Sequence, residues 1–309
     1  MSDGAVAILG ATQPLGRALT ARLLAAGRPV VAVGLEAPTG LAGARYERVD
    51  LTAPGSLRAL LHGPCRAVRT VVNLAFHRDP HAPQAHRLNV ELARELVAVA
   101  EAHPTVAALV HRSSADVYAR RSDRPHLVRE DQPLELDPAA PPWVRQRVEA
   151  DLVVSTPMGT SPLRICVLRC AEILAPDQGS QLYDYLSSRI CLRPMGFDPM
   201  VNVLSLTDAA DAFARAVAVE AEGPFNVPGA DTLPLSRLIR AWGRTGVGVP
   251  GPLLGPLYAA RRAARRTRFR YGANAWRFHY NGVLDGTRAA EGLGYRPAHP
   301  LRTYQPSTS

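Results

Sequence analysis

The sequence contains no lysine: all 36 of its basic residues are arginines, against 27 acidic residues. This absence excludes mechanisms that need a lysine amine, such as Schiff-base formation and the lysines of phosphate-loop enzymes and protein kinases. The formal net charge of +9 therefore rests on guanidinium groups, which stay protonated at neutral pH.

Cysteines and long hydrophobic runs are also scarce. The four cysteines are scattered without a CxxC pair, which argues against a disulfide framework or a metal site and predicts reduced, buried thiols. No run of about 18 apolar residues occurs, and the first apolar segment, residues 5–9, is too short and too early for a signal peptide. We therefore expect a cytoplasmic protein, and its 47% hydrophobic residues suffice for a sizeable core.

Short β-rich runs alternate with helix-length segments in the first half of the chain, which is typical of a parallel sheet with crossover helices. Strands are predicted at 5–9, 29–33, 44–49, 68–74, 107–113 and 163–168, and helices at 15–26 and 84–102. The pattern predicts an α/β fold, a doubly wound parallel sheet, over residues 1–169.

After residue 169 the alternation loosens, so residues 170–309 are predicted to form mainly a smaller, mostly helical lobe. The predicted elements here are helices at 181–188 and 208–220 and strands at 202–205 and 225–227. Because 202–220 still fits a strand and a helix of the main sheet, we expect residues within 200–228 to complete that sheet. Residues 120–142, rich in Pro, Asp and Arg, are expected to form an extended surface loop.

A glycine-containing turn lies between the first predicted strand and the first helix, where dinucleotide phosphates bind. Gly10 permits the tight turn and Gly16 permits close packing of helix on strand, but Gln13 replaces the glycine that brings the backbone close to pyrophosphate. The Gln13 side chain either crowds the pyrophosphate or contacts it through its amide. The predicted loop comprises Gly10, Thr12, Gln13, Pro14, Leu15 and Gly16.

The choice between NAD and NADP stays open, with NAD slightly favoured. The acidic residue that binds the ribose of NAD would fall at Gly34, but Glu36 comes two residues later and no arginine lies beside it. Asp50, followed by Leu51, is predicted either to contact the adenine amino group or to cap a helix at 54–62. The end of the fourth strand completes the predicted cofactor site with Leu74, Ala75 and Phe76.

The chain resembles the extended short-chain dehydrogenase/reductase family in several segments. These are the glycine turn, Val71-Val72-Asn73-Leu74-Ala75, His111-Arg112-Ser113-Ser114-Ala115-Asp116-Val117-Tyr118 and Phe225-Asn226-Val227. The resemblance runs from about residue 5 to 302 and is strongest to the NAD-dependent epimerase/dehydratase branch, including actinobacterial nucleotide-sugar epimerase-like proteins. It implies a Rossmann-type domain, an NAD or NADP cofactor and a homodimer formed through the helices after the fourth and fifth strands.

The family's catalytic set is a serine or threonine, a tyrosine, and a lysine four residues after the tyrosine. Ser114 matches the serine, but Trp143 stands at the tyrosine position and Arg147 at the lysine position. An indole donates a hydrogen bond but does not cycle a proton near neutral pH. The usual Tyr-Lys chemistry is therefore not expected. Arg147 would hold the cofactor ribose or a substrate anion, unless Trp143 and Arg147 are simply a packed and a solvated helix residue.

Glu172, where family members often place a substrate-binding asparagine, is the predicted group for proton transfer; the alternative is a plain salt bridge. The predicted catalytic residues are thus Ser114, Trp143, Arg147 and Glu172. Asp116 and His77 also fall near the expected cleft, His77 more typical of a loop histidine, while Tyr118 is expected to be structural. No metal site is predicted.

Six arginines within ten residues, at positions 261, 262, 265, 266, 268 and 270, form a basic cluster. A solvated stripe is the simplest interpretation; a phosphorylated substrate or an anionic membrane surface are alternatives. Nucleic-acid binding is not expected, because no aromatic residues are interleaved and no known module is present.

Together these features predict an atypical NAD(P)-binding oxidoreductase or epimerase/dehydratase-like enzyme acting on a hydroxylated small molecule, such as a sugar nucleotide or secondary metabolite. Two alternatives stay open. One is a non-redox lyase, isomerase or cyclase on the same fold. The other is a dinucleotide-sensing protein without catalysis.

Overall fold

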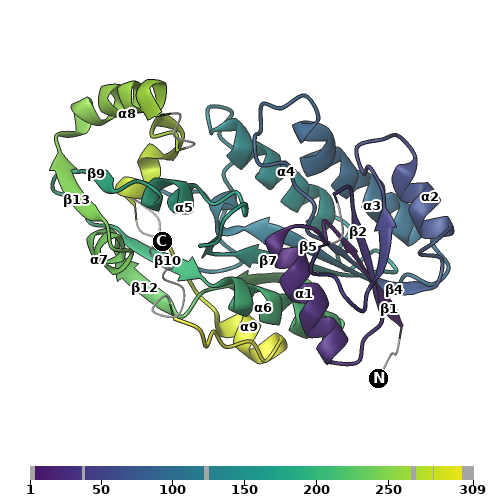
Figure 1. The fold of residues 1–309 in the computed structure, drawn as a ribbon. Helices are drawn as coiled ribbons and strands as arrows, with labels where there is room; N and C mark the ends of the chain where they lie inside the picture. Colours follow the sequence, from purple (N-terminus) through teal and green to yellow (C-terminus); the bar gives the residue numbers. More distant parts are fainter. Residues whose placement is uncertain (1–3, 37–38, 122–124, 266–268, 281, 301–309) are drawn as a thin grey trace.

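A seven-stranded parallel sheet forms the centre of the computed structural model, which describes residues 4–36, 39–121, 125–265, 269–280 and 282–300 (Figure 1). The strand order is β11-β7-β5-β4-β1-β2-β3, and every neighbouring pair is parallel. The strands are β1 Ala5–Leu9, β2 Val30–Gly34, β3 Arg45–Arg48, β4 Val68–Asn73, β5 Ala108–Ser114, β7 Arg164–Cys170 and β11 Gly223–Val227. This doubly wound order confirms the predicted fold class.

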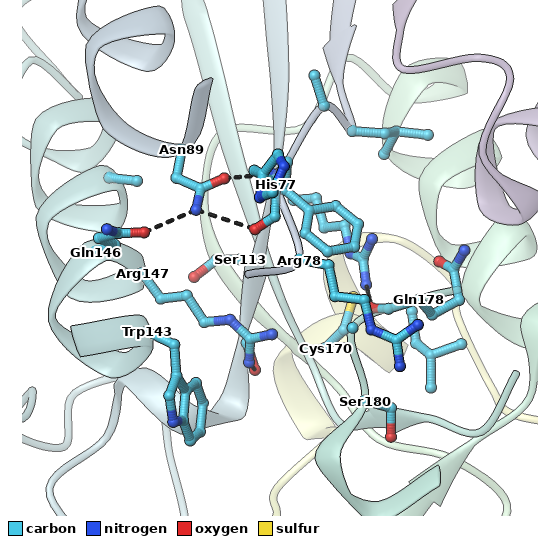
Figure 2. Close-up of a pocket in the computed structure, with 18 of the residues that line it drawn as sticks. His77, Arg78, Asn89, Ser113, Trp143, Gln146, Arg147, Cys170, Gln178 and Ser180 are labelled. Atoms are coloured by element: carbon cyan, nitrogen blue, oxygen red, sulfur yellow. Dashed lines mark hydrogen bonds between the residues drawn. The ribbon is translucent and has the colours of Figure 1, made fainter. Parts of the chain in front are cut away.

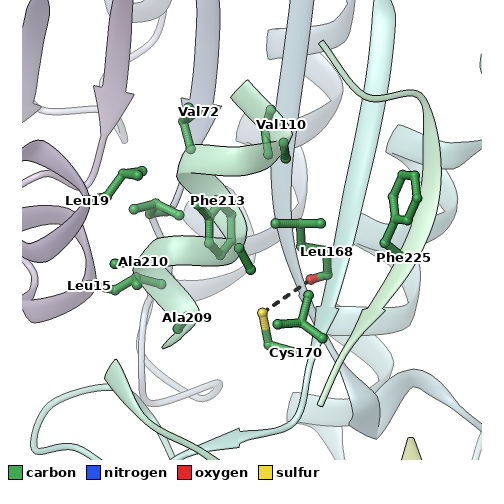
Figure 3. Close-up of a cluster of buried hydrophobic side chains, with 14 of the residues drawn as sticks. Leu15, Leu19, Val72, Val110, Leu168, Cys170, Ala209, Ala210, Phe213 and Phe225 are labelled. Atoms are coloured by element: carbon green, nitrogen blue, oxygen red, sulfur yellow. Dashed lines mark hydrogen bonds between the residues drawn. The ribbon is translucent and has the colours of Figure 1, made fainter. Parts of the chain in front are cut away.

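Helices cover both faces of the sheet because its strands are apolar on both sides. One face carries α1 (Pro14–Ala25) and α6 (Leu206–Ala218), whose apolar side chains pack on the strands (Figure 3). The other face carries α2 (Ser56–His62), a short π-helical segment (Arg87–Glu91) that leads into α3 (Leu92–Glu101), and α4 (Pro142–Ser155). All four cysteines are buried and free, as predicted.

The second lobe contains more strand than the sequence predicts. A three-stranded sheet has the order β12-β10-β8, and β9 and β13 form a parallel pair beside it. The strands are β8 Glu172–Ile173, β9 Ile190–Pro194, β10 Met200–Leu204, β12 Asp231–Pro234 and β13 Thr245–Val249. The helices are α5 Gln181–Leu186, α7 Leu235–Ala241, α8 Gly251–Arg265 and α9 Thr287–Gly292. Strand β13, Thr-Gly-Val-Gly-Val, gives a weak strand signal because two of its five residues are glycines, which are depleted in strands, and only Val249 is buried.

The prediction that 202–205 belongs to the main sheet is wrong. Strand β10, which contains this segment, pairs with β8 and β12. Only β11 joins the main sheet, at the edge beside β7, so that edge is no longer free for β10. The helix predicted at 208–220 is α6, which does cover the sheet.

The predicted loop 120–142 is not wholly irregular in its described part. It contains β6 (Leu127–Val128), which pairs in parallel with β14 (Val283–Leu284), and an isolated bridge joins Tyr118 to Leu134. Residues 122–124 of this segment lie outside the described residues. The pairing with β14 joins this segment to residues 283–284, in the C-terminal part of the sequence.

A buried polar network fixes α4 against the sheet. Asp151 of α4 is fully buried and accepts hydrogen bonds from Ser113 Oγ at 2.5 Å and from Arg169 Nε and Nη2 at 3.0 and 2.8 Å. Arg169 Nη1 also donates to the Tyr118 hydroxyl, which donates to Asn226. The expected structural role of Tyr118 agrees with these contacts. The network sets the position from which α4 presents Trp143 and Arg147.

Candidate active site

Two connected cavities lie at the carboxyl ends of β4, β5 and β7, where ligands bind in doubly wound folds. The inner cavity, about 80 Å³, is lined by Leu74, Ala75, Phe76, Ser114, Trp143, Arg147, Glu172 and Gln178 among others. The outer cavity, about 600 Å³, shares Trp143 and Arg147 with it and extends to Arg262 of α8 and to Arg270. Figure 2 shows Trp143 and Arg147 reaching from α4 towards Arg78, Gln178 and Ser180 across the opening.

Arg147 is the centre of the contacts at the inner cavity. Its Nη1 donates to Ser114 Oγ at 3.1 Å and to Asp116 Oδ2 at 2.6 Å. The Ser114 hydroxyl donates to the same carboxylate at 3.0 Å and accepts from the Asp116 backbone N–H. The interpretation of Arg147 as a solvated helix residue is therefore wrong, because its guanidinium points inward into an ion pair.

A second arginine, Arg277, completes this cluster from the far end of the chain. Its Nη2 donates to Asp116 Oδ1 at 2.6 Å, and its Nη1 forms an ion pair with Glu172. Glu172 thus has the salt bridge that was the alternative to a proton-transfer role. Sequence analysis missed Arg277, which lies on a short 3₁₀ helix, Gly272–Phe278, that no periodic pattern in the sequence predicts.

Asp116 stays ionised although its side chain is only 2% exposed. Burial by itself raises the pKa of this carboxyl group. The nearby guanidinium groups of Arg277, Arg147 and Arg120, with the hydrogen bond from Ser114, outweigh burial and hold the pKa below its usual value. Asp116 therefore acts as the anion that orders these arginines.

Trp143 lies between the two arginine groups, with its ring centre 4.9 Å from the Arg147 guanidinium and 5.3 Å from that of Arg277. These are cation–π distances. The indole Nε1 is buried and has no hydrogen-bond acceptor among the described residues. Trp143 thus presents an N–H donor without an acceptor among the described residues, at the position predicted to correspond to the tyrosine of the family that the sequence resembles.

The glycine turn has the backbone shape that a dinucleotide loop needs. Gly10 adopts φ +81°, and a Cβ there would lie 2.9 Å from the Ala75 backbone N. At Gly16 a Cβ would lie 2.4 Å from the Gly10 carbonyl oxygen. Because α1 starts at Pro14, which has no N–H, the N–H groups of Leu15 and Gly16 are the first of the helix and have no intrahelical acceptor. The turn therefore fits a phosphate group.

Gln13 bridges two loops instead of leaving the turn open. Its Nε2 donates to the Phe76 carbonyl at 3.3 Å, while its buried Oε1 has no donor among the described residues. The side chain therefore neither caps α1 nor points to solvent, and its amide lies between the ends of β1 and β4. This geometry is compatible with both predicted roles of Gln13, contact with the pyrophosphate through its amide and crowding of the pyrophosphate.

The ribose and adenine end of the predicted site is more open. A Cβ at Gly34 would lie 2.7 Å from the Thr12 side chain, so Thr12 occupies the space of the missing acidic residue. Glu36 is exposed, and Leu51 is buried. Asp50 does not cap the following helix, since α2 begins at Ser56 after Gly55; its Oδ1 accepts from the backbone and hydroxyl of Thr52. The cap interpretation of Asp50 is therefore wrong.

His77, which lines both cavities, has a local role in its own loop. The His77 ring hydrogen-bonds the Asp79 backbone within its own loop, as expected for a loop histidine. Across the described ranges, no cluster of three metal-ligating side chains forms. Within the same ranges, no helix is both long and apolar enough to span a membrane.

His111, on the cavity side of β5, makes stability depend on pH. Burial lowers the pKa of His111 from 6.5 to about 4. Between these pH values the imidazole is therefore neutral in the folded protein and protonated in the unfolded chain. Stability from this residue is present above pH 6.5 and is lost as pH falls towards 4. Between pH 7 and 4.5 the expected loss is about 2 kcal/mol. Urea unfolding at both values should show a smaller pH effect in His111→Gln, and equal effects would contradict the assignment.

Comparison with known proteins decides the family. A model of the NAD-dependent epimerase/dehydratase family matches residues 6–226. The chain belongs to this family. This membership confirms the resemblance seen in the sequence and accounts for the order of the main sheet.

The relatives of the chain include an uncharacterized protein and a dehydrogenase. An uncharacterized protein of Mycobacterium bovis is 30% identical over 308 residues, which covers 94% of this chain and 80% of the relative. The dTDP-6-deoxy-L-talose 4-dehydrogenase (NAD(P)(+)) of Kitasatospora kifunensis is 29% identical over 239 residues, 71% of each chain.

Solved structures share the fold at low identity. MoeE5, in complex with UDP-glucuronic acid and NAD, superposes with a TM-score of 0.71 at 18% identity, covering 97% of this chain and 95% of that chain. The dTDP-glucose 4,6-dehydratase DesIV of Streptomyces venezuelae, with NAD bound, gives a TM-score of 0.72 at 18% identity, covering 97% and 94%.

Proposed function

We propose that this protein is an NAD(P)-binding enzyme that acts on an anionic, hydroxylated small molecule of the sugar-nucleotide type. The inner cavity would receive the reacting part of the substrate and the outer cavity its anionic part. Family membership and the shape of the glycine turn support the cofactor. The charge of the outer cavity supports the substrate class, and it carries the proposal.

Unpaired arginines line the outer cavity. Arg78 is neutralised there by Asp177 at 3.1 Å and Asp184 at 2.5 Å. Arg262 and Arg270 are exposed on the same wall, and within the described ranges neither has an ion pair. The opening of the cleft therefore presents two arginines without an ion pair among the described residues, beside one exposed carboxylate, Asp79. This excess of positive charge favours a phosphate or carboxylate.

The position of the net charge points the same way. Between Asp231 and Asp285 the sequence contains ten arginines and no acidic residue. The rest of the chain is close to neutral, so the net charge of +9 belongs to the second lobe. A field of one sign at a cleft attracts anionic ligands and raises their association rate. Of the interpretations of the basic cluster, a phosphorylated or otherwise anionic substrate is therefore preferred.

The residues that would hold the dinucleotide are those of the glycine turn, together with Asp50 and Leu51 for the adenine and Leu74, Ala75 and Phe76 at the end of β4. Glu36 would lie at the adenosine ribose, and Ser114 and Arg147 at the nicotinamide end. When bound, the nicotinamide would accept and return a hydride. The structure supports the phosphate end through Gly10 and Gly16, whose Cβ positions are blocked by backbone.

Arg147 and Trp143 would bind the reacting oxygen of the substrate. Ser114 is fully engaged, since its hydroxyl donates to Asp116 and accepts from Arg147. It would therefore orient Arg147 and not itself polarise the substrate. The guanidinium and the free indole N–H are donors that stabilise negative charge on an oxygen without taking up its proton. Glu172 is the proposed proton acceptor, and its ion pair with Arg277 would have to open for that step.

A second candidate is cofactor-free acid–base chemistry in the same cleft. It is favoured by the link from Gln13 to the Phe76 carbonyl, which spans two loops at the cofactor end, and by the replacement of the Tyr-Lys pair. A dinucleotide sensor without catalysis is the third. The second candidate needs no nicotinamide cofactor, and the third binds the dinucleotide without transferring a hydride.

Titration of the purified protein with NAD+, NADH, NADP+, NADPH and UDP tests the proposal. We expect micromolar affinity for one dinucleotide pair and saturable binding of UDP, as the anion probe. Absence of dinucleotide binding at millimolar concentration would remove the redox enzyme and the sensor. Turnover of candidate sugar nucleotides then separates the redox enzyme from the sensor.

The anion site predicts a charge-specific loss of affinity. In the double variant Arg262→Gln/Arg270→Gln the Kd for UDP should rise about tenfold or more, because two charge-assisted contacts are lost. Its salt dependence should also become shallower. The control, Arg58→Gln/Arg145→Gln, removes two exposed arginines from α2 and α4 and should bind UDP as the wild type does. Equal affinity in both double variants would reject the site.

A further inference from the structure

Arg112 is a partly buried cation that has no ion pair with an acidic side chain among the described residues. It lies on β5 and lines the inner cavity, with its guanidinium 4.6 Å from the centre of the Phe76 ring. Its Nη2 donates to the Gln178 carbonyl at 3.1 Å, while its Nη1 is buried and has no acceptor among the described residues. Burial, with repulsion from Arg147, lowers the pKa of Arg112 to about 10.

Arg169, one strand away, shows how this fold accommodates an arginine that has only a structural role. Its three nitrogens donate to both oxygens of Asp151, to the Tyr118 hydroxyl and to the Glu130 carbonyl. Arg112 has no comparable set. Glu172, the acidic group that interacts with it, is already paired with Arg277, and Arg147 adds repulsion. A buried charge left this way costs stability, so it needs another partner.

Gln178 supplies a second, independent sign of a ligand. Its side chain is 1% exposed and lines the inner cavity with Arg112. Neither its amide nitrogen nor its amide oxygen has a hydrogen-bond partner in the described part of the chain. Buried polar groups are paired in the great majority of cases, so an unpaired amide beside an unpaired guanidinium indicates a missing acceptor.

We propose that Arg112 Nη1 and Gln178 Nε2 bind a phosphate oxygen of a ligand in the inner cavity. This inference rests on the proposed function, since it assigns a further phosphate contact near the glycine turn, where Gln13 stands between Gly10 and Gly16. Phe76 connects the two places, because its ring lies under Arg112 and its carbonyl accepts from Gln13. The phosphate belongs either to the dinucleotide or to the anionic substrate. Both present the oxygen acceptor that a guanidinium binds best.

The test compares wild type with Arg112→Met, which keeps the length of the side chain and removes its charge. Thermal unfolding is followed without ligand and with NAD+, UDP or inorganic pyrophosphate. We expect the ligand-free variant to unfold at the wild-type temperature or above, because an uncompensated buried charge is gone. The stabilisation by the phosphate ligand should be lost, and its Kd should rise at least about tenfold. The ligand whose affinity falls identifies the source of the phosphate.

Two further variants make the outcome decisive. Gln178→Leu should weaken the same ligand several-fold, and Arg145→Met, an exposed arginine on α4, should change neither temperature nor affinity. Lower thermal stability of Arg112→Met with unchanged affinities would show a structural arginine and overturn the inference. If wild type binds no NAD+, the redox proposal fails, and UDP still tests the phosphate site. If none of the three ligands stabilises wild type, the site is rejected.

Discussion

Replacing Asp151 with alanine is expected to lower the free energy of unfolding by about 3–5 kcal/mol, because it leaves a buried guanidinium without its anion. Asp151 is completely buried and receives two hydrogen bonds from Arg169, whose own side chain is 6% exposed. Burial alone lowers the pKa of Arg169, but Asp151 and Tyr118 reverse this and keep the arginine charged. Urea unfolding followed by circular dichroism measures the loss.

Glu149→Ala is the matched control for this prediction. Glu149 lies on the same helix two residues earlier, but its side chain is about half exposed. Its Oε1 lies 3.5 Å from Nη2 of Arg94, whose side chain is also exposed. Such a pair contributes little, so the change should stay within about 0.5 kcal/mol. If the two variants differ by less than about 1 kcal/mol, the network around Asp151 does not anchor α4.

Gly16→Ala is expected to destabilise the protein by about 2–3 kcal/mol and to weaken dinucleotide binding at least about tenfold. The added Cβ would lie 2.4 Å from the Gly10 carbonyl oxygen and 2.6 Å from the Ala11 Cα. Both are backbone atoms, so the loop itself must move, and with it the N–H groups that would face the phosphate. Unfolding curves and a dinucleotide titration measure the two effects.

Gly27→Ala separates this clash from the general cost of replacing a glycine. Gly27 has φ +73° at the end of the first helix, and no atom lies within 4 Å of its Cβ position. The substitution should cost about 1 kcal/mol through backbone strain and leave dinucleotide affinity unchanged. Loss of affinity in Gly27→Ala as large as in Gly16→Ala would mean that the affinity reports overall stability and not loop geometry.

The periodic parts of the fold were predictable because their signal is local. Most strands of the main sheet up to β7 contain a short apolar run, with the polar edge strand β3 as the exception, and α1 ends before Gly27. The alternation of such runs with helix-length segments indicated the doubly wound sheet. Strand β10 was misplaced because its sequence is compatible with either sheet. Its pairing depends on which strand occupies the edge beside β7 in the folded protein, and that strand is β11.

The candidate site, like the fold, was predictable from the sequence only in part. Motif spacing placed Ser114 and Arg147, and their side chains do meet at 3.1 Å. Arg277 could not be found this way, since it contacts Asp116 across 161 residues of chain. Arg112 did leave a local signal, because it is a charged residue within the predicted strand, directly after the apolar run Ala108-Leu109-Val110 and His111. Only the surrounding contacts distinguish it from Arg169, which has the same kind of position but a full set of acceptors.

The sequence by itself determined the absence of lysine chemistry, the parallel sheet and the turn at Gly10 and Gly16, because residue identity and short-range spacing are sufficient for each. The tertiary structure decided which charges are paired. Asp151 neutralises Arg169, Asp116 neutralises Arg147 and Arg277, and Arg112 has no acidic partner among the described residues. Ion pairing acts over a few ångströms between segments far apart in the chain, so no sequence pattern records it.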